Sequence, residues 1–422
     1  MERTIKAAAF SRVKEADPVK NASETMQIEK VSLAFLFLHF LKIGAISWGG
    51  FMALIAVVQK EFVDKKKLVR DDVVIDGISL ASVLPGPVAF NVIAYLGYHL
   101  RGIRGALVSM TGILLPSFLL ILGLAYVYTT YDQIPEINQF FRGVLPAVSA
   151  VIVSVALNMA KKQIAGYRQV MICVSAGIVL LLVRSYFATL GVIAVAGLAG
   201  YFLYNRKGEE PERKLVEQPA FSWLRTGILV AIPVALILTV YLVSLVFVAE
   251  GTILRQMALT FSGLSLTLFG GGYVIIPAMQ QVLVDGLHWL TVQEFADAIA
   301  MGQITPGPIF ISATFIGYKM AGIAGAIVGT VAIFFPPGFI MVFCSRFLDP
   351  IRKSAAIVAA FKGLRPAIIG MIFSAAVTIM KGMDLSIQAG LIFLLILLLT
   401  IRFKVNVVYL IPASGIIGIL VF

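Results

Sequence analysis

The sequence predicts an all-α polytopic membrane protein made of two homologous halves, and two observations carry that prediction. The first is composition: 59% of the 422 residues are hydrophobic, 13% are charged and the mean hydropathy is +0.96, whereas soluble domains carry roughly 25% charged residues. Apolar stretches of the ~20 residues that a membrane-spanning helix needs recur from Val31 to the C-terminus. The second observation is an internal repeat marked by glycine and proline inside those apolar stretches.

The repeat begins with a Pro-Gly-Pro motif that occurs at Pro85–Pro87 and again at Pro306–Pro308 (306 − 85 = 221). GYHLRGIRGALV from Gly97 then matches GYKMAGIAGAIV from Gly317 (317 − 97 = 220). The pairs SWGGF with LFGGGY, LLPSF with FFPPGF, and RGVLPA with KGLRPA follow in the same order and register. Because self-similarity at a fixed period signals duplicated structural units, the two halves are predicted to be homologous.

Each half is predicted to hold six apolar segments. They run roughly over 31–60, 73–100, 105–129, 141–160, 168–184 and 187–204, and over 253–284, 294–319, 323–346, 355–380, 385–401 and 405–422. The predicted organisation is a cytoplasmic N-terminal arm over 1–30, a transporter repeat over 31–204, a polar linker with one linking transmembrane helix over 205–252, and a second repeat over 253–422. The extra crossing reverses the second half, which predicts an inverted-topology repeat with the substrate site between the halves.

Positive charge bears on the membrane topology. The chain has 34 Lys and Arg against 22 Asp and Glu, an excess that we attribute to the positive-inside rule rather than to nucleic-acid binding. The loop with Lys60, Lys65–Lys67 and Arg70 faces outward if every segment crosses, but becomes cytoplasmic if the broken segments are re-entrant hairpins. We favour hairpins, with full crossing and local unwinding as the alternative. The N-terminus is expected in the cytoplasm and the C-terminus outside.

The glycine and proline breaks predict an anion site. Proline ends a helix and glycine permits unusual backbone geometry, and such backbone occurs at membrane depth only inside protein or along a watery cavity. Half-helices beginning near Val88 and Ile309 would direct their positive ends at an anion. The alternative is that the motifs only kink helices for packing. The predicted substrate-binding residues are Ser47, Gly49, Gly50, Pro85, Gly86, Pro87, Asn91, Gly270, Gly271, Gly272, Thr305, Pro306, Gly307, Pro308 and Ser312.

Ionisable residues within apolar segments are expensive and are treated as functional hypotheses. His39 and Lys42 share a helix face, where Lys42 would supply charge to an anion and His39 would titrate. Asp76 and Asp297 match in the repeat (297 − 76 = 221) and, with Glu294, are candidates for carrying a coupling proton. The competing interpretation of these three carboxylates is a solvated or helix-capping role near segment ends.

The sequence lacks the motifs that would indicate a metal-binding, nucleotide-binding or enzymatic function. The sequence contains no metal-ligand cluster and no nucleotide-binding motif, so we expect no metal, no cofactor and no enzymatic activity. Cys173 and Cys344 stand alone in apolar segments and are expected to pack. A passive anion channel and a membrane-embedded enzyme are the alternatives to a transporter.

The sequence resembles the chromate ion transporter family in its long two-domain form, from about residue 33 onward. The stretches that carry the resemblance are FLKIGAISWGGF, LPGP, FGGGY and TPGPIFISATFIGY. The resemblance implies proton-driven chromate efflux across the bacterial inner membrane, with sulfate as the competing substrate. The family residues carried over are Gly49, Gly50, Pro85–Pro87, Gly97, Gly270–Gly272, Pro306–Pro308 and Gly317.

The chain departs from the family pattern beside the expected site. Trp48 replaces the usual phenylalanine before the first Gly-Gly, FMALIA follows where small residues and a histidine are common, and Ser82 replaces a glutamine that only Gln303 keeps. The transport mechanism is therefore better supported than the identity of the anion. The expected partners are an oxyanion, protons and the lipid bilayer, with no nucleic acid, and a homodimer is left open.

Overall fold

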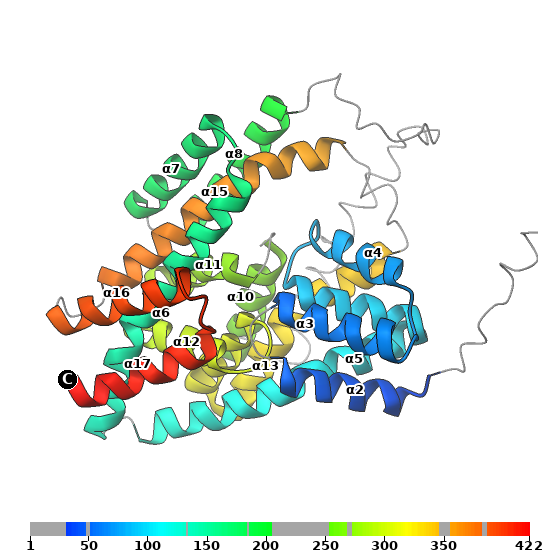
Figure 1. The fold of residues 1–422 in the computed structure, drawn as a ribbon, viewed down its shortest axis with the longest axis horizontal. Coiled ribbons are helices and arrows are strands. Elements are labelled where there is room, and N and C mark those ends of the chain that lie inside the picture. The colour runs from blue at the N-terminus through cyan, green and yellow to red at the C-terminus, as the bar shows by residue number, and fades with distance from the viewer. Residues whose placement is uncertain are drawn as a thin grey trace, which may run out of the picture.

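The structure is a computed structural model of the chain and describes residues 31–47, 51–131, 134–183, 185–204, 253–267, 272–345, 355–381 and 386–422. The predicted arm 1–30 and linker 205–252 lie outside the described residues, as do Gly49, Gly50, Gly270 and Gly271. The regular elements in the described stretches are all helical (Figure 1). Four helical segments among them are long and apolar enough to cross a bilayer. The structure thus confirms an all-helical polytopic membrane protein.

The described residues of the first half form seven helices and one π-helical turn. They are α2 (Leu33–Ile46), α3 (Phe51–Val58) continued by the turn η1 (Gln59–Lys65), α4 (Asp71–Ala81), α5 (Val88–Thr130), α6 (Pro135–Gln163), α7 (Tyr167–Leu182) and α8 (Tyr186–Tyr204).

The second half has the same order. Its elements are α10 (Ile253–Thr267), the 3₁₀ turn η2 (Gly272–Val274), α11 (Ile275–Gln280), the π-helical turn η3 (Gln281–Gly286), α12 (Val292–Ile304), the 3₁₀ turn η4 (Ile309–Ile311), α13 (Ser312–Cys344), α15 (Ala355–Lys381), α16 (Ile387–Ile401) and α17 (Val407–Val421).

The two halves correspond element by element at the offset of the sequence motifs. The starts of α2 and α10 are separated by 253 − 33 = 220, and those of α4 and α12 by 292 − 71 = 221. Left-handed backbone recurs at the same places, with φ of 50° at Lys67 and 54° at His288 (288 − 67 = 221). Because a non-glycine residue with positive φ is uncommon, this pair is a stringent match between the halves.

The predicted first segment, 31–60, is not one helix but a helix pair. α2 has 14 residues and is therefore only about 21 Å long, short of the ~30 Å apolar thickness of a bilayer. Two contacts show that the following helix runs back along α2: the Phe40 and Phe62 ring centroids are 4.9 Å apart, and Lys66 Nζ lies 5.9 Å from the centroid of the Phe35 ring. Both ends of the pair α2 and α3–η1 are thus at the same level of the molecule.

α5 and α13 are each a sharply bent helical hairpin. α5 reverses at Gly102, whose φ is 61°, and α13 reverses at Gly322, whose φ is 60°. Their arms touch through glycines, since a Cβ on Gly97 would lie 2.6 Å from the carbonyl oxygen of Gly105. The predicted break between segments 73–100 and 105–129 is this reversal. After the reversals, the long arms run to Thr130 in α5 and to Cys344 in α13.

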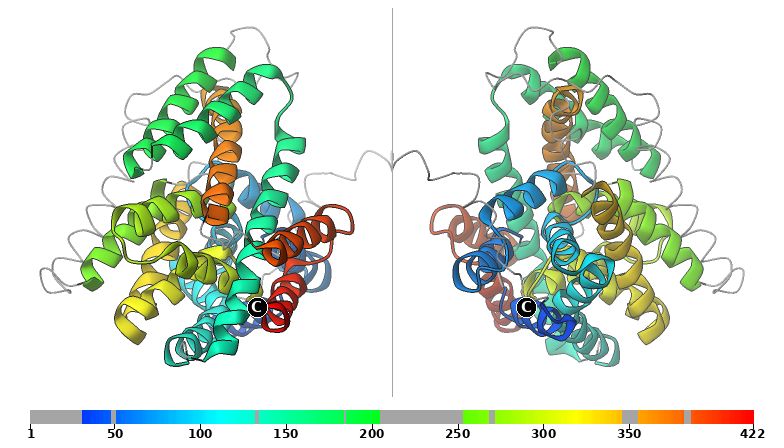
Figure 2. Two further views of the ribbon diagram at one scale, coloured as in Figure 1. Left: turned by 90° about the vertical axis from the view of Figure 1, so that its left-hand side faces the viewer. Right: turned by 90° about the vertical axis from the view of Figure 1, so that its right-hand side faces the viewer.

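The halves exchange helices instead of folding separately. α6 of the first half packs against α16 and α17, and α15 of the second half packs against α7 and α8. Figure 2 shows both groups, with orange α15 beside green α7 and α8, and red α16 and α17 beside α6. Gly143 and Gly363 allow the close approach, because a Cβ on either would come within 2.7 Å of Gly418 or Gly200.

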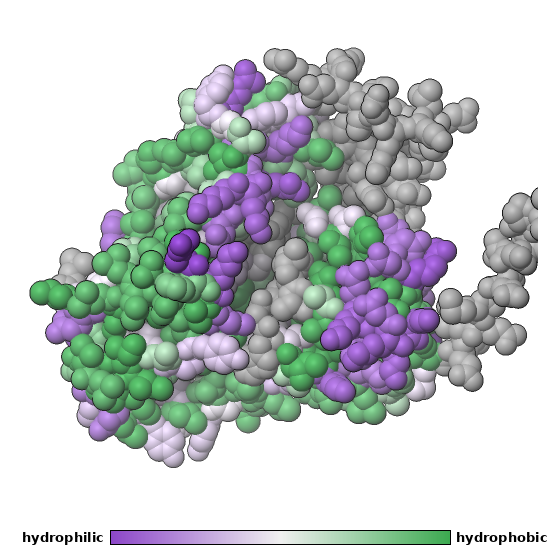
Figure 3. Space-filling view, in the orientation of Figure 1, coloured by the Kyte–Doolittle hydropathy of each residue, from purple (hydrophilic) through white to green (hydrophobic). Residues whose placement is uncertain are grey.

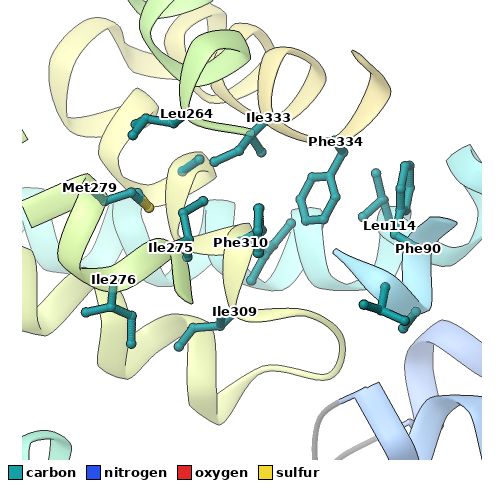
Figure 4. Packing of buried hydrophobic residues seen from close by; sticks show 14 of the residues in the cluster. Phe90, Leu114, Leu264, Ile275, Ile276, Met279, Ile309, Phe310, Ile333 and Phe334 are labelled. Atoms are coloured by element: carbon teal, nitrogen blue, oxygen red, sulfur yellow. The ribbon is translucent and has the colours of Figure 1, made fainter. Parts of the chain in front are cut away.

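One apolar core joins the halves at the centre. Phe90 and Leu114 of α5 meet Phe334 of α13 (Figure 4), with the Phe90 and Phe334 ring centroids 5.1 Å apart and Phe310 and Phe334 6.1 Å apart. Outside, apolar residues cover α16 and α17, while hydrophilic residues gather over the α3–α4 region (Figure 3). Exposed Leu391, Leu394 and Leu420 form a surface suited to lipid.

The hairpin glycines give a direct test of the fold. We expect Gly97→Ala to lower the free energy of unfolding by about 1–3 kcal/mol, because the new methyl group overpacks the α5 reversal. Gly123→Ala on the same helix, where a Cβ meets nothing within 4 Å, is the matched control and should be neutral or slightly stabilising. Thermal unfolding of the detergent-purified variants measures both, and equal stability would contradict the close hairpin packing.

Candidate functional site

The first Pro-Gly-Pro motif forms a tight turn between α4 and α5. Gly86 has φ of 95°, a left-handed geometry that favours glycine. The side-chain amide of Asn91 donates to the carbonyl oxygen of Pro85 at 2.8 Å and braces the turn. Asn91 Oδ1 is buried and has no hydrogen-bond partner, which is costly unless a further donor is supplied.

The second motif repeats this turn between α12 and α13. Gly307 has φ of 111°, and the half-helix predicted near Ile309 starts as the 3₁₀ turn η4 before α13 begins at Ser312. Thr305 is buried and its hydroxyl donates to Gly302 O at 3.2 Å. Ser312, the register partner of Asn91, has a buried hydroxyl without a partner.

Each motif is clamped by the long arm of the other half. A Cβ on Gly86 would lie 2.3 Å from Cβ of Pro337, and one on Gly307 would lie 2.9 Å from Oγ of Ser117. Ser117 and Pro337 are themselves register partners (337 − 117 = 220). Ser117 Oγ also donates to the carbonyl oxygen of Pro306. The two turns therefore make equivalent contacts across the interface between the halves.

The end of α2 reaches the second motif. The Gly307 N–H donates to the carbonyl oxygen of Ser47 at 3.2 Å, so the SWGGF motif of one half touches the Pro-Gly-Pro of the other. Ser47 is 1% exposed and its hydroxyl has no partner.

A cavity of about 270 Å³ lies between the two breaks. Its lining combines the first motif with the second and with the start of α17: Pro87, Val88, Ala89, Gly272, Tyr273, Gly302, Gln303, Thr305, Gly307, Pro308, Ile309, Asn406, Val407 and Val408. One water needs roughly 10–15 Å³ of such space, so an oxyanion with some of its water fits. The cavity thus unites Pro87, Gly272, Thr305, Gly307 and Pro308 of the predicted site.

Among the described residues, the lining contains no charged side chain. An anion there would be held by dipoles, chiefly the free N–H groups at the start of α5, because the first N–H groups of a helix lack intrahelical acceptors. Six residues of the predicted site are not in the lining: Pro85, Gly86, Pro306, Asn91, Ser312 and Ser47. Of these, Asn91 hydrogen-bonds to the first turn and Ser47 to the second.

Gln303 is a functional candidate that the sequence-based site left out. It lines the cavity, is 9% exposed, and neither atom of its amide has a hydrogen-bond partner. Its register partner Ser82 bonds to Ile78 O at 2.7 Å and does not line the cavity. The available signal was its position three residues before the second Pro-Gly-Pro. Tyr273, the last residue of the LFGGGY motif, and Asn406, which no motif marks, also enter the lining.

Asp297 lies inside the protein on the helix that carries Gln303. It is 1% exposed, accepts a hydrogen bond from Tyr128 OH at 2.9 Å and accepts another from Gln293 Nε2 at 3.0 Å. Tyr128 belongs to α5, so this contact also joins the halves. Asp297 precedes Gln303 on α12 (303 − 297 = 6), which places it about 9 Å away along the helix.

The other predicted carboxylates lie elsewhere. Glu294 forms a capping box with Thr291 at the start of α12 and an ion pair with Lys319 at 2.8 Å, which gives it a structural role. Asp76 is half-buried on α4 and does not line the cavity.

His39 and Lys42 are also separate from the cavity between the breaks. They lie in a second cavity of about 290 Å³ between α2 and η1.

The comparisons with known proteins agree with this architecture. The sequence profile of the chromate transporter family matches residues 34–201 and 255–419. The chain belongs to the chromate transporter family. The starts of the two matched ranges repeat the offset of the motifs (255 − 34 = 221), and membership supports a role in chromate transport.

Full-length relatives share this organisation. The chain is 30% identical to an uncharacterised transporter of Methanocaldococcus jannaschii, over 96% of this chain and 99% of that protein. It is 30% identical to the chromate transport protein of Cupriavidus metallidurans, over 88% and 89% respectively, and 30% identical to that of Pseudomonas aeruginosa, over 92% of each. No solved structure matches the chain.

Gln303 gives a test of the candidate site. We expect Gln303→Leu to raise the KM for chromate uptake about tenfold, because a hydrogen bond to a charged group contributes about 1.5–3 kcal/mol. Gln280→Leu is the control, since Gln280 is 2% exposed, has an unpartnered amide nitrogen and does not line the cavity. Equal KM values in the two variants would exclude Gln303 from the substrate site.

Proposed function

We propose that the protein is a secondary active transporter that exports chromate, or a related oxyanion, across the bacterial inner membrane in exchange for protons and so confers chromate resistance. The observation that carries the proposal is the uncharged cavity between the two Pro-Gly-Pro turns. Its polar groups belong to both halves, as expected for a substrate site between repeats.

Dipoles in place of cations suit a transported dianion. A site lined by fixed lysines would hold a dianion tightly in a low-dielectric interior, and tight binding slows release. Free backbone N–H groups and the Gln303 amide give weaker binding that recognises a tetrahedral shape. Sulfate has the same charge and shape, so we expect it to compete.

Asymmetry between the halves supports alternating access. α12 packs against α13, and its register partner α4 packs against the equivalent α5, but α12 also packs against α6 and α17, whereas the other described partner of α4 is η1. In an inverted repeat, exchanging these two environments opens the site to the other side of the membrane. A passive channel, the main alternative, needs no such exchange.

The α2 and α3–η1 pair supports re-entrant hairpins. Lys66 returns to the level of Phe35, so the cationic loop lies on the side from which α2 starts. The positive-inside rule places that side in the cytoplasm.

Cysteine labelling tests this topology. In a variant whose buried cysteines, Cys173 and Cys344, are replaced by alanine, Lys66→Cys should react with an impermeant maleimide only in inverted vesicles. Its register partner Leu287→Cys (287 − 66 = 221) is 43% exposed and should react only in right-side-out vesicles. Labelling of both from the same side would contradict the inverted repeat.

We propose Asp297 as the proton carrier, with Tyr128 as its positioning residue. A buried carboxylate that bridges the halves near the cavity is placed to sense the exchange of environments. Asp76 lacks this burial.

Uptake of radiolabelled chromate into inverted vesicles tests transport and coupling together. Uptake should rise with an imposed proton gradient and fall with excess sulfate. Asp297→Asn should keep sulfate-sensitive uptake but lose the stimulation by the gradient, while Asp76→Asn keeps it. Wild-type uptake indifferent to the gradient would favour a channel, and no uptake would remove chromate as the substrate.

A further inference from the structure

The cavity between α2 and η1 has no role in the site described above. Its volume is about 290 Å³. Five polar or charged residues line it: His39 and Lys42 of α2, Glu61 and Lys65 of η1, and Lys66, which follows η1. Ile43 and Ile46 of α2 complete the lining. The cavity, here called the α2–η1 pocket, is therefore rich in cations.

The positive charge of the α2–η1 pocket is only partly neutralised. Lys65 Nζ pairs with Glu61 Oε1 at 2.7 Å. Within the described part of the chain, neither Lys42 nor Lys66 has a carboxylate at ion-pair distance. Two ammonium groups are thus available to an anion, and lysine binds phosphate-like groups as a point charge.

Aromatic packing holds the pocket walls in place. The His39 ring stacks on Phe35 at 3.7 Å and its Nδ1 donates to Phe35 O at 2.9 Å. Lys66 Nζ lies 5.9 Å from the centroid of the same Phe35 ring, a cation–π contact. Lys66 is therefore held beside the pocket by a contact that leaves its N–H donors free for an anion.

The pocket has no charged counterpart in the second half. The register partners of Lys42 and Lys66 are Gly263 and Leu287 (263 − 42 = 287 − 66 = 221), and that of Glu61 is Val282. A pocket that only followed from the duplicated fold would recur there. Its cations mark one end of the molecule and not the other.

α2 connects this pocket to the central cavity. Lys42 precedes Ser47 on the same stretch of chain (47 − 42 = 5), about 7.5 Å along the helix, and the Ser47 carbonyl accepts the Gly307 N–H. An anion in the pocket is thus one helix segment from the Pro-Gly-Pro turn that lines the cavity.

We propose that the α2–η1 pocket is a second oxyanion site, which takes a free tetrahedral dianion from the cytoplasmic side and loads the central cavity. The claim that the pocket binds an anion depends only on the pocket's own residues, whereas the loading role rests on the proposed function. The uncharged cavity selects shape, and the pocket raises the local concentration of anion on one side.

The test measures binding and uptake with the full chain. In phosphatidylcholine nanodiscs, equilibrium dialysis with labelled sulfate and chromate should show two sites. The double variant Lys42→Gln and Lys66→Gln should raise the Kd of one of these sites about tenfold. The double variant Lys42→Arg and Lys66→Arg, which keeps both charges, should leave that Kd unchanged. In inverted vesicles the Gln pair should raise the chromate KM several-fold with the maximal rate unchanged, as expected for a loading site.

The matched control removes the same charge outside the pocket. It combines Lys60→Gln with Lys67→Asn, the latter chosen because Lys67 has φ of 50°, which Asn tolerates. If the control variant loses as much sulfate and chromate affinity as the variant with Lys42→Gln and Lys66→Gln, the proposed binding site is wrong. Loss of sulfate binding in phosphatidylglycerol nanodiscs would show that lipid phosphate fills it and would overturn the loading role. If both sites bind anion but the protein takes up no chromate, the proposed function would be contradicted, while anion binding in the α2–η1 pocket would stand.

Discussion

The contact between each Pro-Gly-Pro turn and the long arm of the opposite half is the constraint on which the rest of the structure depends. Gly86 and Gly307 have left-handed backbone and face Pro337 and Ser117 with no room for a side chain. Only glycine satisfies both conditions. The flanking prolines end the helices there, so the helix ends of both halves meet at one place and leave a cavity between them.

That cavity lies in a protein whose halves cannot separate without losing their cores. α6 and α15 pack on the last two helices of the opposite half, and glycines such as Gly143 and Gly363 bring backbones together, which is how membrane helices associate where water supplies no driving force. Exchange of partners fixes the axis about which the halves are related. Among the register pairs, α4 and α12 have clearly unequal surroundings.

Charged side chains are distributed differently around the central cavity and the α2–η1 pocket. The described lining of the central cavity has no charged side chain, Asp297 is buried and hydrogen-bonded across the halves, and three lysines line the α2–η1 pocket. In the mechanism that we propose, a dianion in the central cavity meets no fixed positive charge of the described lining, which favours its release because electrostatic attraction is strongest in a dry interior. The arrangement places attraction at the surface, where it is screened and reversible.

The sequence by itself determined the membrane class, the duplication and the two break motifs, since each depends on local properties: hydropathy, a fixed offset and the stereochemistry of glycine and proline. It located the segment breaks at which α5 and α13 reverse, Gly102 and Gly322, but it did not reveal that α2 is too short to cross or that helices exchange between halves. It did not include Gln303 among the substrate-binding residues and offered His39 and Lys42 as candidates for charge or proton coupling, whereas Gln303 lines the central cavity and His39 and Lys42 line the other one. Only the tertiary structure decided these, because which side chains share a cavity depends on contacts between segments from opposite halves of the chain, which no local pattern records.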